Sequence, residues 1–319
     1  MLFKRLGWTW YRPIGMDWFT HGYFKIAEPY GNDPITIGQY LDINDLPYEP
    51  YTNLNEIVDN KNGIFHSYDG ENHIIHNAIT YEMFKKIKFD YIIATHPAHG
   101  NWEELLQFQP TAKFVMQLGN EGQTTTAKNV LSSVWAYTPL PGQNIIYYHQ
   151  EFDITKYRYE PPTNHTLIRS FVHLLPEKSM FEIYRSALNG FKMEAYGMAT
   201  ENGVGLDLPT QMRESAFGWH IKPADGYGAV IHNWFACGRP IITKGSYYAG
   251  KTGGLLLEDD KTCIDLDKHT FEGSLERIRY WSQPDHHMEM CQNAYDRFKE
   301  IVDFDKEQKD IELFLSNTV

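Results

Sequence analysis

The sequence predicts an α/β protein with two parallel-sheet domains, and three observations lead to this prediction. The chain has 319 residues, which suits two domains of ordinary size better than one. Strand-like and helix-like segments alternate over residues 64–150, and the alternation restarts at residue 166. Between these blocks stand Pro161 and Pro162, which fit neither a helix interior nor a central strand. We therefore expect an N-terminal domain over residues 1–158 and a C-terminal domain over residues 163–300.

The elements of the N-terminal half follow from hydrophobic spacing and turn residues. The first 60 residues are rich in proline, glycine and aromatic residues, which predicts loops around one or two strands. The later segments predict a helix over residues 73–88, a strand over 89–97, a helix over 101–108 with Asn101 as its N-cap, and a strand over 112–120. The alternation continues through residues 130–137 and 144–150.

The C-terminal half shows the same alternation. The predicted strands cover residues 166–175, 191–199, 216–222 and 240–243. The predicted helices cover residues 176–191, 210–216 and 228–237, the last of which stops at Gly238. The tail over residues 285–315 is predicted to be helical, with a possible break at the charged segment 303–310.

Composition and charge exclude several classes of protein. The formal net charge is −12, and no basic stripe offsets it, so nucleic acid is disfavoured as a general partner. The three cysteines are far apart and odd in number, which predicts neither a disulfide framework nor a cysteine metal site. The sequence contains no signal-like N-terminus and no apolar run long enough to span a membrane. These features predict a cytoplasmic protein.

Several acidic and histidine patterns raise the question of a metal. Asp265-Leu266-Asp267 and Asp303-Phe304-Asp305 both have an Asp-x-Asp form, but such patterns are frequent in a chain with 41 acidic residues. We expect both to be solvated surface. The histidine pairs 73/76 and 286/287 lack a carboxylate or cysteine that would complete a ligand set. The prediction is a metal-independent protein without a cofactor.

The segment ADGYG, residues 224–228, has the properties of an anion-binding loop. It follows a predicted parallel strand and precedes a predicted helix, so the free N–H groups of that helix point at the loop. Gly226 and Gly228 allow the backbone to approach a bulky anion, and Lys222 adds a positive charge at the strand end. Asp225 is placed to accept hydrogen bonds from sugar hydroxyls. The other interpretation is an ordinary glycine-rich turn with Asp225 at the N-terminus of the helix.

The stretch ADGYGAVIHNWFACGRPIIT, residues 224–243, resembles the donor-site segment of GT-B glycosyltransferases. The similarity is to the large retaining group with an acidic-x7-acidic motif, the family 4 or group 1 type. Asp225 stands at the first acidic position, and Asn233, which has no carboxylate, stands at the second. Tyr227 occupies the aromatic position of the motif. On this resemblance Asp225, Gly226, Tyr227, Gly228 and Asn233 belong to the donor site.

A second resemblance lies in SFVHLLPEKSMFEIYRSAL, which begins at Ser170. It is similar to the first strand, loop and helix of the family's C-terminal domain. Lys178 matches the family lysine that would bind the donor pyrophosphate. His173 stands where the family usually has arginine, so Lys222 is expected to share the phosphate charge.

The resemblance implies two Rossmann-like domains that face each other across a cleft, with residues 301–319 forming a helix that packs back toward the N-terminal domain. The C-terminal half would hold a nucleotide-sugar, UDP- or GDP-linked and most simply a hexose. The N-terminal half would hold the acceptor. Transfer would retain configuration, as in the group that the sequence resembles.

Two residues of the N-terminal half are candidates for chemistry. His96 ends the predicted strand 89–97, so it is expected to face the cleft, where it resembles a family histidine close to the sugar. It is also a candidate base for an inverting reaction. Asp17 lies in a loop where it is a candidate catalytic base for the acceptor. A packed loop histidine and a surface aspartate are the other interpretations.

Two other functions stay open. A sugar-nucleotide epimerase has the same architecture but needs several carboxylates in the cleft, and only Asp225 is placed there. A nucleotide- or carbohydrate-binding protein with a decayed site would explain the unusual His173 and Asn233. The acceptor is expected to be a glycan or a lipid-linked sugar. A modified base in phage DNA is a less favoured alternative, because the net charge of −12 opposes it.

Overall fold

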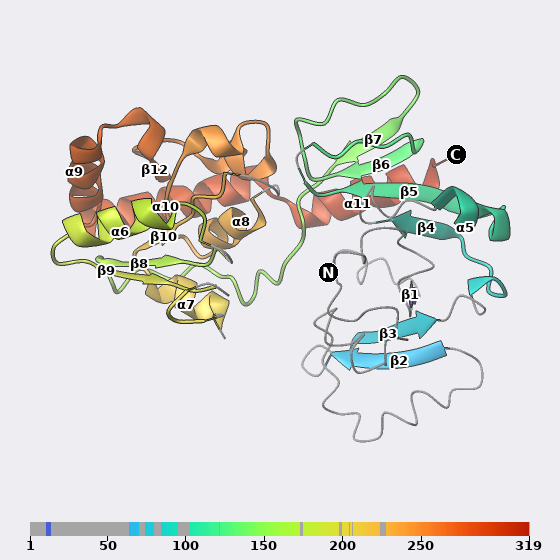
Figure 1. Cartoon of the computed structure of the whole chain (residues 1–319), viewed down its shortest axis with the longest axis horizontal. Coiled ribbons are helices and arrows are strands. Elements are labelled where there is room, and N and C mark those ends of the chain that lie inside the picture. The colour runs from blue at the N-terminus through green and yellow to red at the C-terminus, as the bar shows by residue number, and fades with distance from the viewer. Residues whose placement is uncertain are drawn as a thin grey trace.

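The computed structural model describes the chain in several ranges. These are residues 11–13, 64–69, 74–79, 84–94, 102–120, 122–172, 175–197, 200–203, 205, 207–223 and 228–318. Their elements form two groups that lie side by side, each built around its own parallel sheet (Figure 1). Among these residues no helix combines the length and apolar character that crossing a membrane requires.

The N-terminal half contains a four-stranded parallel sheet. Its strands follow in chain order and pair in that order: β4 (Tyr91–Ala94), β5 (Lys113–Leu118), β6 (Asn129–Ser132) and β7 (Asn144–Tyr147). Helix α5 (Trp102–Phe108) connects β4 to β5, as the sequence predicts. The described residues between β5 and β7 form strand β6 and loops, so the alternation with helices stops after α5.

A separate three-stranded sheet precedes this one. Strands β2 (Ile64–Asp69) and β3 (Ile74–Ile79) pair antiparallel over their full length, and β1 (Tyr11–Pro13) pairs parallel with β3. The prediction of a helix over residues 73–88 is therefore wrong for residues 74–79. Apolar residues in so short a stretch fit both a helical and a strand period, and pairing with β2 decides between them.

The C-terminal half contains a five-stranded parallel sheet in the order β12-β11-β10-β8-β9. Its strands are β8 (Leu167–Ser170), β9 (Lys192–Ala195), β10 (Phe217–Trp219), β11 (Ile241–Thr243) and β12 (Cys263–Asp265). Its helices are α6 (Lys178–Ala187), α7 (Leu208–Glu214), α8 (Ala229–Ala236), α9 (Phe271–Trp281) and α10 (Pro284–Ile301). Three 3-10 turns follow β11: η2 (Gly245–Tyr248), η3 (Thr252–Leu256) and η4 (Leu266–Lys268).

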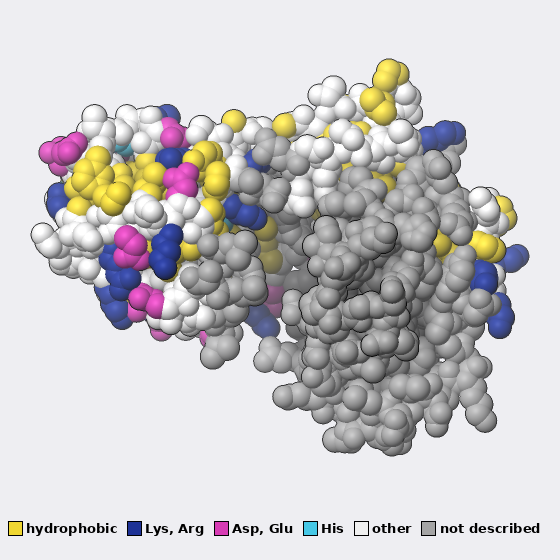
Figure 2. All heavy atoms as spheres, viewed as in Figure 1, with side chains coloured by type: hydrophobic (Ala, Val, Ile, Leu, Met, Phe, Trp, Pro, Cys, Tyr) yellow, Lys and Arg dark blue, Asp and Glu magenta, His cyan; other side chains and the backbone are white. Residues whose placement is uncertain are grey.

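Helices cover both faces of this sheet. On one face α6 and α9 bury Phe181 and Ile278 against the strands, and on the other α8 and α10 bury Trp234 and Phe298. Figure 2 shows hydrophobic side chains gathered on the outside of the layer formed by α6 and α9. Ile183 of α6 is 56% exposed. Elements predicted from the sequence match this half well, but β12 and α9 were not predicted.

Arg239 joins the linker between the two halves, residues 157–165, to the C-terminal half. Its guanidinium is 1% exposed and donates to the backbone carbonyls of Glu160 (2.8 Å), Ser215 (2.9 Å) and Arg213 (2.5 Å). A buried cation is tolerated when its donors are satisfied in this way. The preceding Gly238 has a φ of 66°, and a Cβ there would lie 2.2 Å from the Tyr159 ring, so this helix end requires glycine.

The last helix, α11 (Phe304–Ser316), leaves the C-terminal half and packs on the N-terminal sheet (Figure 1). Its Ile311 and Leu315 share a core cluster with Val115 of β5 and Leu131 of β6. The hydroxyl of Tyr91 donates to the carbonyl of Leu315 at 2.9 Å. Helix α11 therefore ties the C-terminal half to the half that contains β4 to β7.

Removing one α11 side chain tests this contact. Ile311 is fully buried, so Ile311→Ala is expected to lower the free energy of unfolding by about 2–5 kcal/mol. On the same helix Leu313 is 64% exposed, and Leu313→Ala is expected to change it by less than about 0.5 kcal/mol. Chemical denaturation measures both values. Equal effects from the two variants would contradict the packing of α11 described above.

Candidate functional site

Three lysines follow three neighbouring parallel strands at the same edge of the C-terminal sheet. Lys178 begins α6 after β8, Lys222 lies shortly after β10, and Lys244 directly follows β11. Because β8, β10 and β11 are adjacent and parallel, their carboxyl ends lie at one edge. Lys178 is exposed and Lys222 is half-buried, and neither forms an ion pair with a residue that the structure describes. Among the described residues, Lys178 and Lys222 are therefore cations at this edge without a paired carboxylate, although Glu177 and Asp265 also lie at it.

Lys244 was missed by the sequence analysis and differs from the other two in having a partner. Its Nζ lies 3.2 Å from the Glu177 carboxylate, which also accepts a hydrogen bond from the Tyr247 hydroxyl. The Tyr247 hydrogen bond, together with Lys244, holds the pKa of Glu177 below its ordinary value. The position of Lys244 at the end of a parallel strand was the signal that could have identified it.

The loop that carries Glu177 is strained. Glu177 has a φ of 59° and Leu175 a φ of 39°, a region that non-glycine residues rarely occupy. Both residues lie in the turn from β8 to α6, directly before Lys178. The ion pair with Lys244 and the hydrogen bond from Tyr247 hold Glu177 in this conformation.

The start of α8 lies at the same edge and packs against a second glycine segment. Gly228 is the N-cap of α8 with a φ of 87°, and a Cβ there would lie 3.1 Å from the Cα of Gly253 in η3. Glycine is therefore required by both the backbone conformation and the close approach. The first N–H groups of α8 carry the positive end of the helix dipole toward the edge with the lysines.

Asn233 lies in the second turn of α8 and is half-buried. Its side chain hydrogen-bonds to Tyr157 of the linker, although burial is the larger effect and raises the pKa of that tyrosine. The structure thus places Asn233 where α8 meets the linker.

Six predicted site residues lie outside the described part of the chain. They are Asp17, His96, His173, Asp225, Gly226 and Tyr227. Of the predicted set, the structure brings Lys178, Lys222 and Gly228 to one edge of the C-terminal sheet. Their roles stay predictions.

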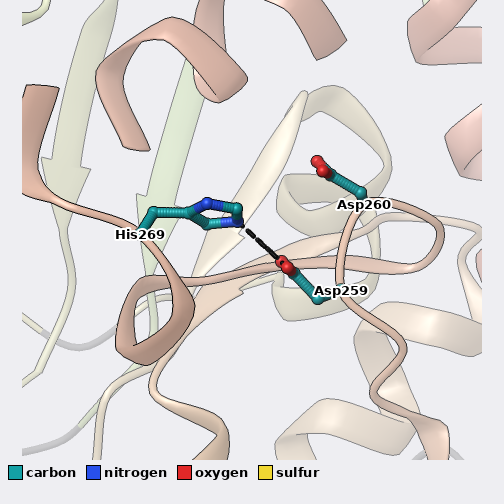
Figure 3. Close-up of side chains that lie close together, drawn as sticks. All are labelled: Asp259, Asp260 and His269. Atoms are coloured by element: carbon teal, nitrogen blue, oxygen red, sulfur yellow. Dashed lines mark hydrogen bonds and ion pairs between the residues drawn. The ribbon is translucent and has the colours of Figure 1, made fainter. Parts of the chain in front are cut away.

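Among the described residues, one group has the spacing that a metal ion needs. Ligand atoms of Asp259, Asp260 and His269 lie within 4.8 Å of one another (Figure 3). Protein donors already occupy these carboxylates: Asp259 accepts from the Asp265 N–H at 2.9 Å and contacts His269 at 3.0 Å, and Asp260 accepts from the Trp281 indole at 2.9 Å. We therefore assign these three residues a structural role, in which they anchor the segment around β12.

The prediction that Asp265 lies on a solvated surface is wrong. Asp265 is 8% exposed, and its carboxylate accepts from the backbone N–H of Gly245 (2.8 Å) and of Asp267 (3.1 Å). It therefore ties the end of β12 to the turn after β11. Asp267 is exposed, and Asp303 is an exposed residue that caps α11 by accepting from the backbone N–H groups of residues 305 and 306.

The fold has clear counterparts among solved structures. HepE from Anabaena, solved with UDP, has a TM-score of 0.59 at 14% identity, with 76% of this chain and 86% of that chain covered. The chain has the GT-B fold. A glycosyltransferase from Rickettsia africae gives 0.57 at 12% identity over 75% and 80%. The sucrose-phosphate synthase of Thermosynechococcus elongatus gives 0.56 at 10% identity over 80% and 85%.

The GT-B fold confirms the architecture that the sequence predicts, and with it the resemblance to GT-B glycosyltransferases at the level of structure. At such low identity the likeness extends to the fold alone. No protein-family profile matches the chain, and no curated protein matches it.

His220 directly follows β10 beside this edge, and its ionisation makes the stability of the native protein depend on pH. Burial, followed by the charge on Lys222, lowers the pKa of His220 to about 3. The native protein therefore keeps His220 neutral, whereas the unfolded chain takes up a proton near pH 6.5. Native stability is lost as pH falls from about 6.5 toward 3.

This linkage predicts the effect of one substitution. Between pH 7.5 and pH 5, His220 is expected to account for about 2 kcal/mol of lost stability. His220→Leu should lower stability at pH 7.5 but weaken its pH dependence. Thermal unfolding at the two pH values measures this. An unchanged pH dependence in His220→Leu would show that His220 has the same pKa in the native and the unfolded protein.

Proposed function

We propose that the chain is a glycosyltransferase that moves a sugar from a nucleotide-sugar to an acceptor. The observation that carries the proposal is the cationic edge formed by Lys178, Lys222 and the start of α8. Ligands of open parallel sheets bind at the carboxyl ends of the strands, and this edge adds positive charge and free backbone N–H groups there. A diphosphate carries the complementary charge.

The lysines take a defined part in this chemistry. When the bond between the sugar and the diphosphate breaks, negative charge grows on the departing phosphate. Fixed cations close to that phosphate stabilise the charge without a metal ion. Among the described residues, neither lysine forms an ion pair with a carboxylate.

Fold and sequence similarity together support the donor class. HepE, which shares this fold, has been solved with UDP and with UDP-glucose. We propose a UDP- or GDP-linked hexose as donor, with Asp225 holding the sugar and Asn233 near the ribose. Retention of configuration follows from the resemblance of residues 224–243 to retaining enzymes.

The N-terminal half is proposed to bind the acceptor, a glycan or a lipid-linked sugar. His96 follows β4, whose carboxyl end lies at the same edge of its sheet as the ends of β5, β6 and β7. Closing the two halves on a bound donor would exclude water and so favour transfer over hydrolysis.

Nucleotide binding by lysine variants tests the proposal. Lys178→Ala and Lys222→Ala are each expected to raise the Kd for UDP or GDP by about 5- to 50-fold, because each removes a charged hydrogen-bond donor to the diphosphate. Lys192→Ala is the control. Lys192 is 72% exposed and begins β9, at the opposite edge of the same sheet. Isothermal titration calorimetry measures the three constants.

Two results would overturn the assignment. One is equal affinity for the nucleotide in all three variants and the unchanged protein. The other comes from incubation with the nucleotide-sugar alone: an epimerised nucleotide-sugar that forms without any acceptor would identify an epimerase instead.

A further inference from the structure

Two buried histidines meet where the two halves of the molecule join. His149 lies just after β7 of the N-terminal half, and His232 lies on α8 of the C-terminal half. Their ring centroids are 5.1 Å apart at an interplanar angle of 62°. The residues are 3% and 2% exposed. Neither belongs to the motifs that the sequence analysis identified.

Glu307 of α11 fixes a proton on the Nδ1 atom of His149. The Glu307 carboxylate lies 2.5 Å from the His149 Nδ1, and it also accepts from the His149 backbone N–H at 2.9 Å. A carboxylate only accepts hydrogen bonds, so the Nδ1 atom carries the proton. The Nε2 atom of His149 is then an acceptor in the uncharged ring and a donor in the ring that pairs with Glu307 as a cation.

The protonation of His232 is fixed in the same sense. Its Nδ1 lies 3.0 Å from the carbonyl oxygen of Gly228, which also only accepts, so the Nδ1 atom donates. Burial, followed by the charge on His149, lowers the pKa of His232 to about 3. The Nε2 atom of His232 thus keeps its lone pair at neutral pH.

Both Nε2 atoms are buried, and neither has a hydrogen-bond partner in the described part of the chain. Buried acceptors are costly unless a donor satisfies them. Trp135 lies beside His149 with ring centroids 5.9 Å apart, and it is 42% exposed. An exposed aromatic ring therefore lies directly beside His149 of the pair.

The chemistry of this cluster selects its ligand. The lone pair of His232 repels an anion, so the cluster is unsuited to the diphosphate itself. A hydroxyl group both donates and accepts hydrogen bonds and so satisfies either Nε2 atom, and a sugar carries several hydroxyls on a ring whose C–H faces pack on an aromatic plane such as Trp135.

We propose that Trp135, His149 and His232 form a subsite for a sugar, in which the Nε2 atom of His232 accepts a hydrogen bond from one sugar hydroxyl and the Nε2 atom of His149 hydrogen-bonds to another. The subsite deepens the proposed glycosyl transfer and rests on it. The sugar comes either from the donor or from the acceptor. Separation of the halves exposes both nitrogen atoms, because each half contributes one of them.

Substitutions at His232 separate the role of each ring nitrogen. His232→Gln places an amide near the position of Nε2, whereas His232→Asn places one near Nδ1 and removes the acceptor. Trp135→Ala removes the aromatic face. Its control is Tyr280→Ala on α9, because Tyr280 is also 42% exposed.

The experiment measures affinity for ligands with and without a sugar. The donor arm compares UDP and GDP with UDP-glucose, UDP-galactose, UDP-N-acetylglucosamine and GDP-mannose. The acceptor arm titrates the corresponding free sugars with and without the nucleotide. In the arm that holds the sugar, His232→Asn and Trp135→Ala are expected to weaken binding of the sugar-bearing ligand at least about fivefold, while the affinity for UDP or GDP alone changes less than about twofold. His232→Gln and Tyr280→Ala are expected to retain it.

Each outcome decides between the proposals. Sugar binding that is unchanged in His232→Asn and Trp135→Ala overturns the subsite, even if the nucleotide still binds. Failure of the unchanged protein to bind any sugar in either arm overturns it as well, as does tight binding of Zn²⁺ that depends on both histidines. Free-sugar binding that depends on Trp135 and His232, without binding of any nucleotide, supports the subsite and removes the proposed donor chemistry.

Discussion

The return of α11 to the N-terminal sheet is the contact on which the arrangement of the two halves depends. Ile311 and Leu315 bury their side chains against β5 and β6, so this helix is held by the N-terminal half although it follows the C-terminal half in the chain. Glu307 of the same helix binds His149 through both its backbone and its ring. The linker crosses between the halves once, and α11 supplies a second crossing that limits how they move.

The distribution of charge shows how an acidic protein keeps a cationic edge. Arg239 donates its hydrogen bonds to backbone carbonyls of the linker and the C-terminal half, and Lys244 forms an ion pair with Glu177. Lys178 and Lys222 have no such partner among the described residues. In a protein with a net charge of −12, these two unpaired cations are what an anionic ligand meets at close range among the described strand ends.

The sequence was most informative where local signals agree. Segment 216–243 combines a buried strand, a glycine loop, a helix and a glycine stop, and the structure has β10, α8, Gly238 and β11 there. The signals failed where pairing decides the structure, as in residues 74–79, which become a strand through contact with β2. Strand β12 has three residues and depends on its pairing with β11. Asp265 was misjudged because its partner, the N–H of Gly245, is 20 residues away in the chain.

The helix α8 connects the features that matter for function. Its N-cap, Gly228, lies at the cationic edge, and the carbonyl of that residue orients His232 one turn later. His232 faces the N-terminal half, and Asn233 faces Tyr157 of the linker. A ligand that binds at the start of α8 therefore acts on a rigid element whose next turn touches both the other half and the linker. The contact between His149 and His232 buries two nitrogen atoms without hydrogen-bond partners in the described part of the chain, so the stability of this contact depends on which ligand binds to them. An occupied donor site would in this way favour one arrangement of the halves over another.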